Sequence, residues 1–164
     1  MTNEPVTGNQ VRPSPRAQTM ALQSVGNRIV RGMLRTPLVC RLAGGRLVTL
    51  YIVGRKSGRR YTVPVAYTRS DGDLLIGTPF GWGRNLRTGE AVAIRLKGRR
   101  RLADVEVYTD ERAVTDAYGV MCRDNRTFAK FNHVSLDAAG HPDQTDLHLA
   151  WAGGARAFRL TPRQ

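Results

Sequence analysis

Hydrophobic and polar residues alternate at the two-residue period of β-strands through the middle of the chain. The segment "RLVTLYIV" is instead apolar at nearly every position, which is typical of a strand covered on both faces. Asp71-Gly72 and Gly98-Arg99 are turn signals between strands, and Pro64 favours an edge or a bulge. The pattern predicts strands at residues 46–53, 60–69, 73–79, 91–97, 101–109 and 155–161.

Elsewhere the apolar residues recur at steps of three and four, which indicates helices. The spacing predicts a helix over Met20–Arg35 and a short one from Pro37 to Leu42. Asp110 and Asp143 are predicted N-caps of two later helices, the first with an inner stripe of Val114, Ala117, Tyr118 and Met121. A single helical turn is expected at residues 84–88, and residues 126–143 have no regular pattern.

This order of elements predicts an α+β fold, a small antiparallel barrel of about six strands with flanking helices. Residues 1–19 contain three prolines and few large apolar residues, so we expect a disordered tail before a single domain at 20–164. The chain shows no secretory signal and no apolar run long enough to span a membrane. The lone thiols Cys40 and Cys122 suit a reducing cytoplasm.

The charge is unevenly distributed along the chain. Of a net charge of +13, residues 5–70 contribute 12 cations and no acid, whereas residues 71–164 hold 14 cations and 12 acids. Such an excess predicts an anionic partner: a phosphate, a polycarboxylate, a nucleic acid or a lipid headgroup.

The basic turn in "VGRKSGRRYTVPV" is the best local candidate for that partner. Backbone N–H groups of a short glycine turn can converge on an anion, and neighbouring arginines add charge-assisted hydrogen bonds. The alternative is a solvated hairpin in an arginine-rich protein. Three histidines, His133, His141 and His148, match no metal-ligand spacing, and nucleotide-binding glycine motifs and serine-hydrolase motifs are missing.

The stretch "TLYIVGRKSGRRYTVPVAYTRSDGDLLIGTPFGWGRNLRTGE" resembles the deazaflavin (F420)-dependent nitroreductase family, the A branch of the flavin/deazaflavin oxidoreductases. The shared marks are the Gly-Arg-Lys-Ser-Gly turn, the proline six residues later and Asn85-Leu86. The resemblance implies a split β-barrel and coenzyme F420, a deazaflavin hydride carrier with a phosphate and an oligoglutamate tail.

Carried over by position, the resemblance assigns Arg55, Lys56 and Ser57 to the phosphate and tail, and the strand beyond the turn to the deazaflavin. Thr78 and Pro79, at the end of the third predicted strand, would lie near the ring, and Trp82, Arg84 and Asn85 would approach the other end of the cofactor. The full set is Arg55, Lys56, Ser57, Gly58, Arg60, Tyr61, Val63, Pro64, Val65, Ala66, Thr78, Pro79, Trp82, Arg84 and Asn85. The chain departs from its relatives at Arg60-Tyr61, often Pro-Arg, and at Thr78-Pro79-Phe80-Gly81, often Ser-Lys-Gly-Gly.

The resemblance implies hydride transfer to an electrophilic acceptor such as a quinone or a nitro compound. Tyr118, Phe128 and Phe131 are candidates for the acceptor side, although each is more typical of core packing. No residue stands out as a catalytic acid or base. The alternatives are a coenzyme- or polyanion-binding protein without turnover, a reductase using flavin mononucleotide (FMN), and a nucleic-acid binder. We also expect a homodimer to be feasible, and weak membrane contact through the basic helix at residues 20–35.

Overall fold

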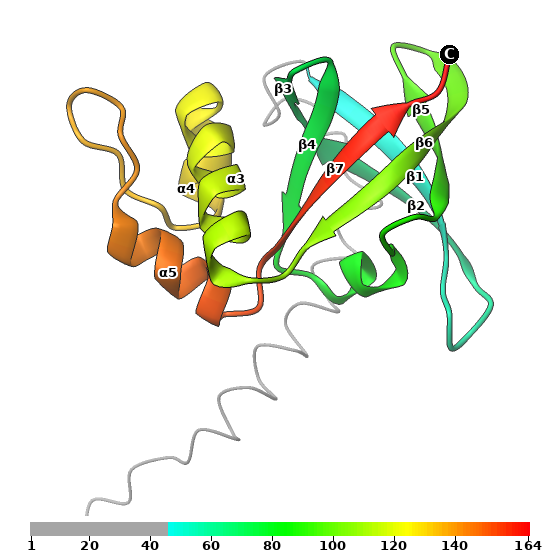
Figure 1. Ribbon diagram of the computed structural model, residues 1–164, viewed down its shortest axis with the longest axis horizontal. Helices are drawn as coiled ribbons and strands as arrows, with labels where there is room; N and C mark the ends of the chain where they lie inside the picture. Colours follow the sequence, from blue (N-terminus) through cyan, green and yellow to red (C-terminus); the bar gives the residue numbers. More distant parts are fainter. Residues whose placement is uncertain (1–45) are drawn as a thin grey trace, which may run out of the picture. The chain divides into compact units, whose positions relative to one another are not determined.

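The computed structural model of the protein describes residues 46–164 (Figure 1). The helices predicted before residue 45 and the boundary at residue 19 lie outside the described residues. The strands are β1 Leu47–Val53, β2 Arg60–Ala66, β3 Thr68–Ser70, β4 Asp73–Thr78, β5 Ala91–Leu96, β6 Arg99–Tyr108 and β7 Arg156–Pro162. The helices are η1 (a 3₁₀ helix) Gly81–Asn85, α3 Glu111–Asp124, α4 Arg126–Phe131 and α5 Gln144–Ala152.

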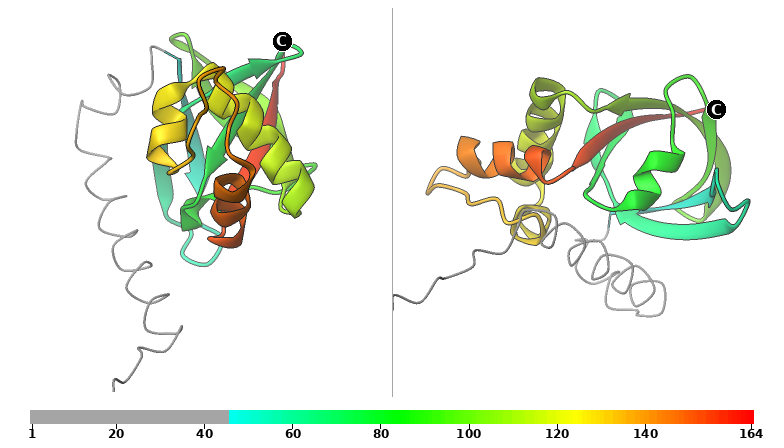
Figure 2. Two further views of the ribbon diagram at one scale, coloured as in Figure 1. Left: turned by 90° about the vertical axis from the view of Figure 1, so that its left-hand side faces the viewer. Right: turned by 90° about the horizontal axis from the view of Figure 1, so that it is seen from below.

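All seven strands form one antiparallel sheet in the order β2-β1-β5-β6-β7-β4-β3. Its two outermost strands, β2 and β3, are consecutive in the chain and are separated only by Tyr67. A sheet whose first and last strands are joined by one residue has to curl round on itself, as the right-hand view of Figure 2 shows. The predicted α+β fold with a split β-barrel is thereby confirmed.

This closure explains why one predicted strand is two. Residues 60–69 read as a single strand, but the chain leaves one end of the sheet after Ala66 and enters the other end at Thr68. Tyr67 makes the transition with its side chain buried in the barrel. The sheet therefore has seven strands instead of about six. Pro64 lies on β2, an edge strand, as the sequence predicted.

Two hydrophobic cores stabilise the molecule. Alternate residues of the strands fill the barrel, among them Val48, Leu50, Ile94 and Phe158. The opposite faces of β4 and β7 pack against the helices through Leu75 and a set of helix residues that includes the predicted stripe Val114, Ala117, Tyr118 and Met121. The helices thus cover one side of the barrel (Figures 1 and 2).

β1 is covered less evenly than its sequence predicted. Val48, Leu50 and Ile52 are buried in the barrel, whereas the alternate residues Leu47, Thr49 and Tyr51 are half-buried. The strand therefore has one fully covered face and one partly covered face.

Two local predictions were wrong. Residues 126–131, expected to be irregular, form α4 because the Asn125 side chain accepts hydrogen bonds from the N–H groups of Thr127 and Phe128. The helical turn expected at 84–88 lies earlier, at Gly81–Asn85. It ends there because Leu86 adopts an extended conformation and its side chain is buried in the barrel core. By contrast, Asp110 and Asp143 cap α3 and α5 as predicted.

Candidate functional site

The basic turn between β1 and β2 is closed by its own backbone. The N–H of Gly54 donates to the carbonyl of Arg59 over 2.7 Å, and the N–H of Gly58 donates to the carbonyl of Gly54 over 2.7 Å. Gly58 has a φ of 63°, a left-handed conformation that favours glycine. Ser57 Oγ accepts the N–H of Arg59 at 3.3 Å. The turn is therefore short and ordered, with Lys56 exposed at its tip.

Gly54 is buried beneath this turn. A Cβ atom at Gly54 would lie 2.8 Å from Ser57 Oγ and 2.9 Å from a ring carbon of Tyr61. Ser57 and Tyr61 are thus packed against the turn backbone. The glycine is required here because the side chains of the motif close over it.

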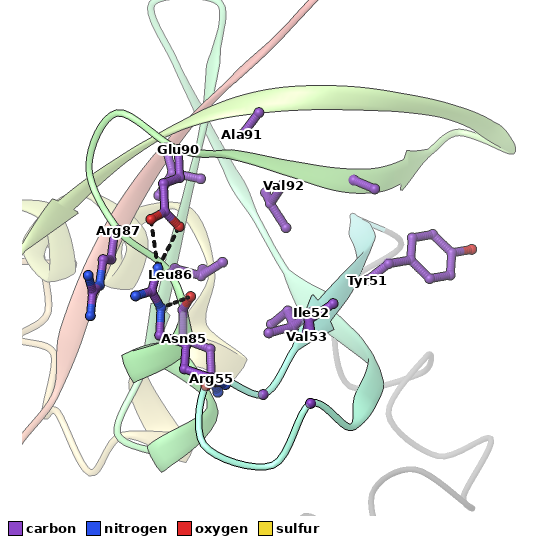
Figure 3. A pocket seen from close by; sticks show the side chains of 14 residues that line it. Tyr51, Ile52, Val53, Arg55, Asn85, Leu86, Arg87, Glu90, Ala91 and Val92 are labelled. Carbon is purple, nitrogen blue, oxygen red and sulfur yellow. Dashed lines mark hydrogen bonds and ion pairs between the residues drawn. The ribbon is translucent and has the colours of Figure 1, made fainter.

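Arg55 joins the turn to the loop after β4 (Figure 3). Its backbone N–H donates to Asn85 Oδ1 over 3.1 Å, and its Nε lies 3.4 Å from the carbonyl of Asn85. The Asn85 side chain also donates from Nδ2 to the carbonyl of Trp82 over 2.9 Å. Asn85 therefore holds together two segments that the sequence separates by 30 positions.

The Arg55 guanidinium also forms an ion pair that the sequence did not predict. Its Nη2 lies 2.6 Å and 2.8 Å from the two carboxylate oxygens of Glu90. These residues border an open pocket of about 390 Å³ with Asn85 and Arg87, beside apolar residues of β1 and β5 (Figure 3). One signal was present: Glu90 is the only acid between Asp73 and Asp104, among seven cations.

The loop after β4 is fixed mainly by packing. Thr78 is buried, and its Oγ1 accepts the N–H of Phe80 over 3.1 Å. The Trp82 ring stacks on Phe158 with centroids 6.3 Å apart. A Cβ at Gly83 would lie 2.9 Å from both Phe158 and Thr78. Pro79 and Arg84 remain exposed, so this loop presents a mixed surface over a rigid base.

β2 forms the wall that follows the turn. Arg60 is exposed at its start, Val63 is buried in the barrel, and Pro64, Val65 and Ala66 are half-buried. Within residues 46–164, β2 pairs only with β1, so its other edge carries backbone groups without sheet partners.

The three candidate acceptor-side residues lie in different environments. Tyr118 is fully buried and makes an edge contact with Phe128 at 5.2 Å between centroids. Its hydroxyl has no hydrogen-bond partner in the described part of the chain, and burial raises the pKa of that hydroxyl well above its usual range. Phe131 is 48% exposed and meets Phe80 edge-on at 6.1 Å. Of the three, Phe131 is therefore the one whose side chain is accessible beside the loop after β4.

Two of the three histidines form ion pairs or hydrogen bonds with carboxylates instead of facing one another. His141 pairs with Asp137, and His148 Nδ1 lies 2.6 Å from Glu111. Asp143 caps α5, and Asp146 accepts the N–H of Ser135 over 2.8 Å. Over residues 46–164 there is no group of three or more side chains that could hold a metal ion.

Within residues 46–164, no helix is both long and apolar enough to cross a bilayer.

Comparison with known proteins gives weak structural relatives and one family. A conserved hypothetical protein of Mycobacterium tuberculosis is 14% identical, with a TM-score of 0.46 over 77% of this chain and 79% of that chain. A candidate 5-nitroimidazole antibiotic resistance protein of Bacteroides thetaiotaomicron is 14% identical, with a TM-score of 0.45 over 72% and 73%. No curated protein matches the sequence significantly.

The family match covers the cofactor-side residues of the site but ends before Phe128 and Phe131. The profile of the F420H(2)-dependent quinone reductase family matches residues 8–126, which is more than half of the chain. The matched range includes the basic turn, β2, the loop after β4 and Glu90. The protein belongs to the F420H(2)-dependent quinone reductase family, and thus to the F420-dependent oxidoreductases.

Proposed function

We propose that the protein is an F420-dependent reductase that transfers hydride from the reduced coenzyme to an electrophilic acceptor, a quinone or a nitroaromatic compound. The observation that supports this most directly is the basic turn at residues 54–59, which is fastened to Asn85 and leads directly into β2, a strand whose outer edge pairs with no other strand of residues 46–164. Family membership makes coenzyme F420 the ligand to expect there.

The residues at the turn fit an anionic cofactor. Lys56, Arg59 and Arg60 are exposed and form no ion pair with any residue in the range 46–164. They would hold the phosphate and carboxylates by charge-assisted hydrogen bonds. The half-buried Pro64, Val65 and Ala66 would support the planar ring, and the loop from Thr78 to Asn85 would limit its movement.

When bound, the cofactor supplies the hydride, so the task of the protein is orientation and exclusion of water. Phe131 and Phe80 provide an accessible aromatic edge near the loop, which suits an apolar, planar acceptor. Tyr118 and Phe128 support this region from the helix layer, since Tyr118 has no exposed surface of its own.

Parallel titrations and turnover assays test this proposal. The purified protein should bind coenzyme F420 in equilibrium titration and should not bind FMN with comparable affinity. It should then oxidise reduced F420 only when a quinone or a nitroaromatic acceptor is added, as followed by the absorbance of the deazaflavin. Binding without turnover for any acceptor would instead identify a coenzyme-binding protein, and preference for FMN would identify a flavin enzyme.

A further inference from the structure

We propose that Glu90 is an internal counterion of the anion site: it occupies Arg55 in the free protein and is displaced when an anionic ligand binds. Glu90 would thus determine which anions the turn can retain. This inference rests on the proposed function, because it concerns the same basic turn. Its starting observation is the contact of Arg55 Nη2 with both carboxylate oxygens of Glu90, at 2.6 and 2.8 Å.

Arg55 is held so that its guanidinium can pair either with Glu90 or with an anionic ligand. Its backbone and Nε are fixed by Asn85, which leaves the far end of the guanidinium to interact with other groups. Nη2 donates to Glu90, while Nη1 donates to no residue within the range 46–164. The Arg55 side chain is 32% exposed, so a ligand can reach it from solvent.

Glu90 is fixed at its backbone but not at its carboxylate. Its carbonyl accepts the N–H of Val105 over 3.1 Å, which ties residue 90 to β6. Its side chain is 54% exposed and has Arg55 as its only ion-pair partner in the described region. The carboxylate can therefore swing into water while the surrounding strands stay in place.

The charge around the pocket makes this carboxylate distinctive. Glu90 is the only acidic residue among those that line the pocket, where Arg55 and Arg87 supply cations. Other acids on β6 already pair elsewhere: Asp104 with Arg163, and Glu106 with Arg159 over a longer distance. Removal of the Glu90 charge therefore leaves Arg55 without a counterion in residues 46–164, because Asp104 and Glu106 stay paired with other arginines.

The free energy needed to displace Glu90 from Arg55 lowers the affinity of the site for every anion. An exposed ion pair shifts an equilibrium by no more than about five-fold, so every anion that uses Arg55 loses affinity by a similar factor. A small monoanion, already bound weakly, becomes negligible. A ligand with a phosphate and several carboxylates also reaches Lys56, Arg59 and Arg60, and so still binds. Glu90 would therefore raise the affinity that any ligand of Arg55 must have, and a ligand with several anionic groups meets that requirement through its additional contacts.

The test compares Glu90→Gln with Asp116→Asn in the full chain. Asp116 is a suitable control because its side chain is 75% exposed on α3 and its only ion pair within residues 46–164, with Arg112, is 4.0 Å long. Calorimetric titration with coenzyme F420 and with inorganic pyrophosphate should show affinities about two- to five-fold higher in Glu90→Gln. In Asp116→Asn, which removes the same net charge, both affinities should stay within about two-fold of the wild type.

The same substitution in an Arg55→Ala variant tests whether Glu90 acts on binding through Arg55. There, adding Glu90→Gln should raise affinity by less than two-fold, because the cation that Glu90 occupies is gone. If Glu90 merely supports the turn, Glu90→Gln would weaken binding and lower the melting temperature, which overturns the inference. No pyrophosphate binding by either wild type or Glu90→Gln also overturns it.

The two proposals can fail separately. If pyrophosphate binds more tightly to Glu90→Gln but coenzyme F420 never binds, the counterion role stands and the proposed function fails. If F420 binds and turns over while Glu90→Gln behaves like Asp116→Asn, the proposed function stands and the counterion role is wrong.

Discussion

Residues 46–164 contain two strongly basic hairpins, and only one of these two has the contacts of a binding site. The β1–β2 turn is fastened by Gly54, Asn85 and Glu90 to its own backbone and to two other segments. The β5–β6 hairpin has five cations within residues 95–101, and none of them forms an ion pair with another residue of 46–164. Because β1 and β5 are antiparallel neighbours, the two turns lie at opposite ends of the sheet.

The difference shows that charge density alone does not identify a binding site. In the β5–β6 hairpin Arg95 lies directly opposite Arg100, an arrangement of like charges that is unfavourable. Arg100 is stabilised instead by the Tyr51 ring, whose centroid is 4.5 Å from its guanidinium carbon. In the β1–β2 turn, the key cation is positioned by hydrogen bonds, and its charge is balanced by an exposed carboxylate.

The largest expected effect is on coenzyme binding. Replacing Arg55 and Lys56 together with alanine should weaken F420 binding by about 2–4 kcal/mol, at about 1.5–3 kcal/mol per charge-assisted bond discounted for exposure. Replacing Arg99 and Arg101 removes the same charge from the other hairpin and should change binding by less than about 0.5 kcal/mol. Titration of both double mutants decides the matter. Equal losses would mean that only overall charge counts.

The second largest effect is expected on stability, when the glycine of each turn is replaced with alanine. Gly54→Ala forces a Cβ against Ser57 and Tyr61, so the free energy of unfolding should fall by about 1–3 kcal/mol. Gly98→Ala meets no atom within 4 Å but has to keep a φ of 78°, which costs about 1 kcal/mol. Denaturant unfolding measures both.

Coenzyme affinity separates the two glycine variants further. It should fall only in Gly54→Ala, since Gly98 lies at the other end of the sheet. A loss of affinity in Gly98→Ala as well would contradict the functional difference between the turns.

The sequence predicts individual helices and strands well, but it predicts contacts between distant parts of the chain poorly. Asp110 and Asp143 predict where their helices begin, because an N-cap side chain accepts a hydrogen bond from a residue only three positions later. The division of residues 60–69 at Tyr67 depends on closure of the whole sheet, and no local pattern encodes it. At the site, the motif around Arg55 was recognisable, but its pairing with Glu90 spans 35 positions. Only the isolation of Glu90 among cations could have suggested that pair.

Removal of one charge from the β5–β6 hairpin should stabilise the protein. Arg95→Gln eliminates the like-charge pair with Arg100, so the free energy of unfolding should rise by about 0.2–1 kcal/mol at low salt. The gain should shrink at high salt, where exposed charges are screened. Arg84→Gln, which changes an exposed cation outside any strand pair, should stay within about 0.5 kcal/mol of the wild type. Destabilisation by Arg95→Gln would indicate that the arginine has a contact of its own.

The smallest effect concerns the oligoglutamate tail and tests which basic turn the tail meets. Each added glutamate near Lys56, Arg59 and Arg60 should strengthen binding by about 0.2–1 kcal/mol, the value of an exposed ion pair. The gain should end once the tail extends beyond this turn, because screening limits the field to about 8–10 Å at physiological salt.

Dissociation constants for coenzymes of different tail length, at two salt concentrations, measure this gain. The dependence on tail length should disappear when Arg59 and Arg60 are replaced with glutamine and persist when Arg99 and Arg101 are. The reverse result would place the tail at the β5–β6 hairpin. Tighter binding to DNA than to the coenzyme would instead favour a nucleic-acid partner, although a short turn cannot follow a long phosphate backbone.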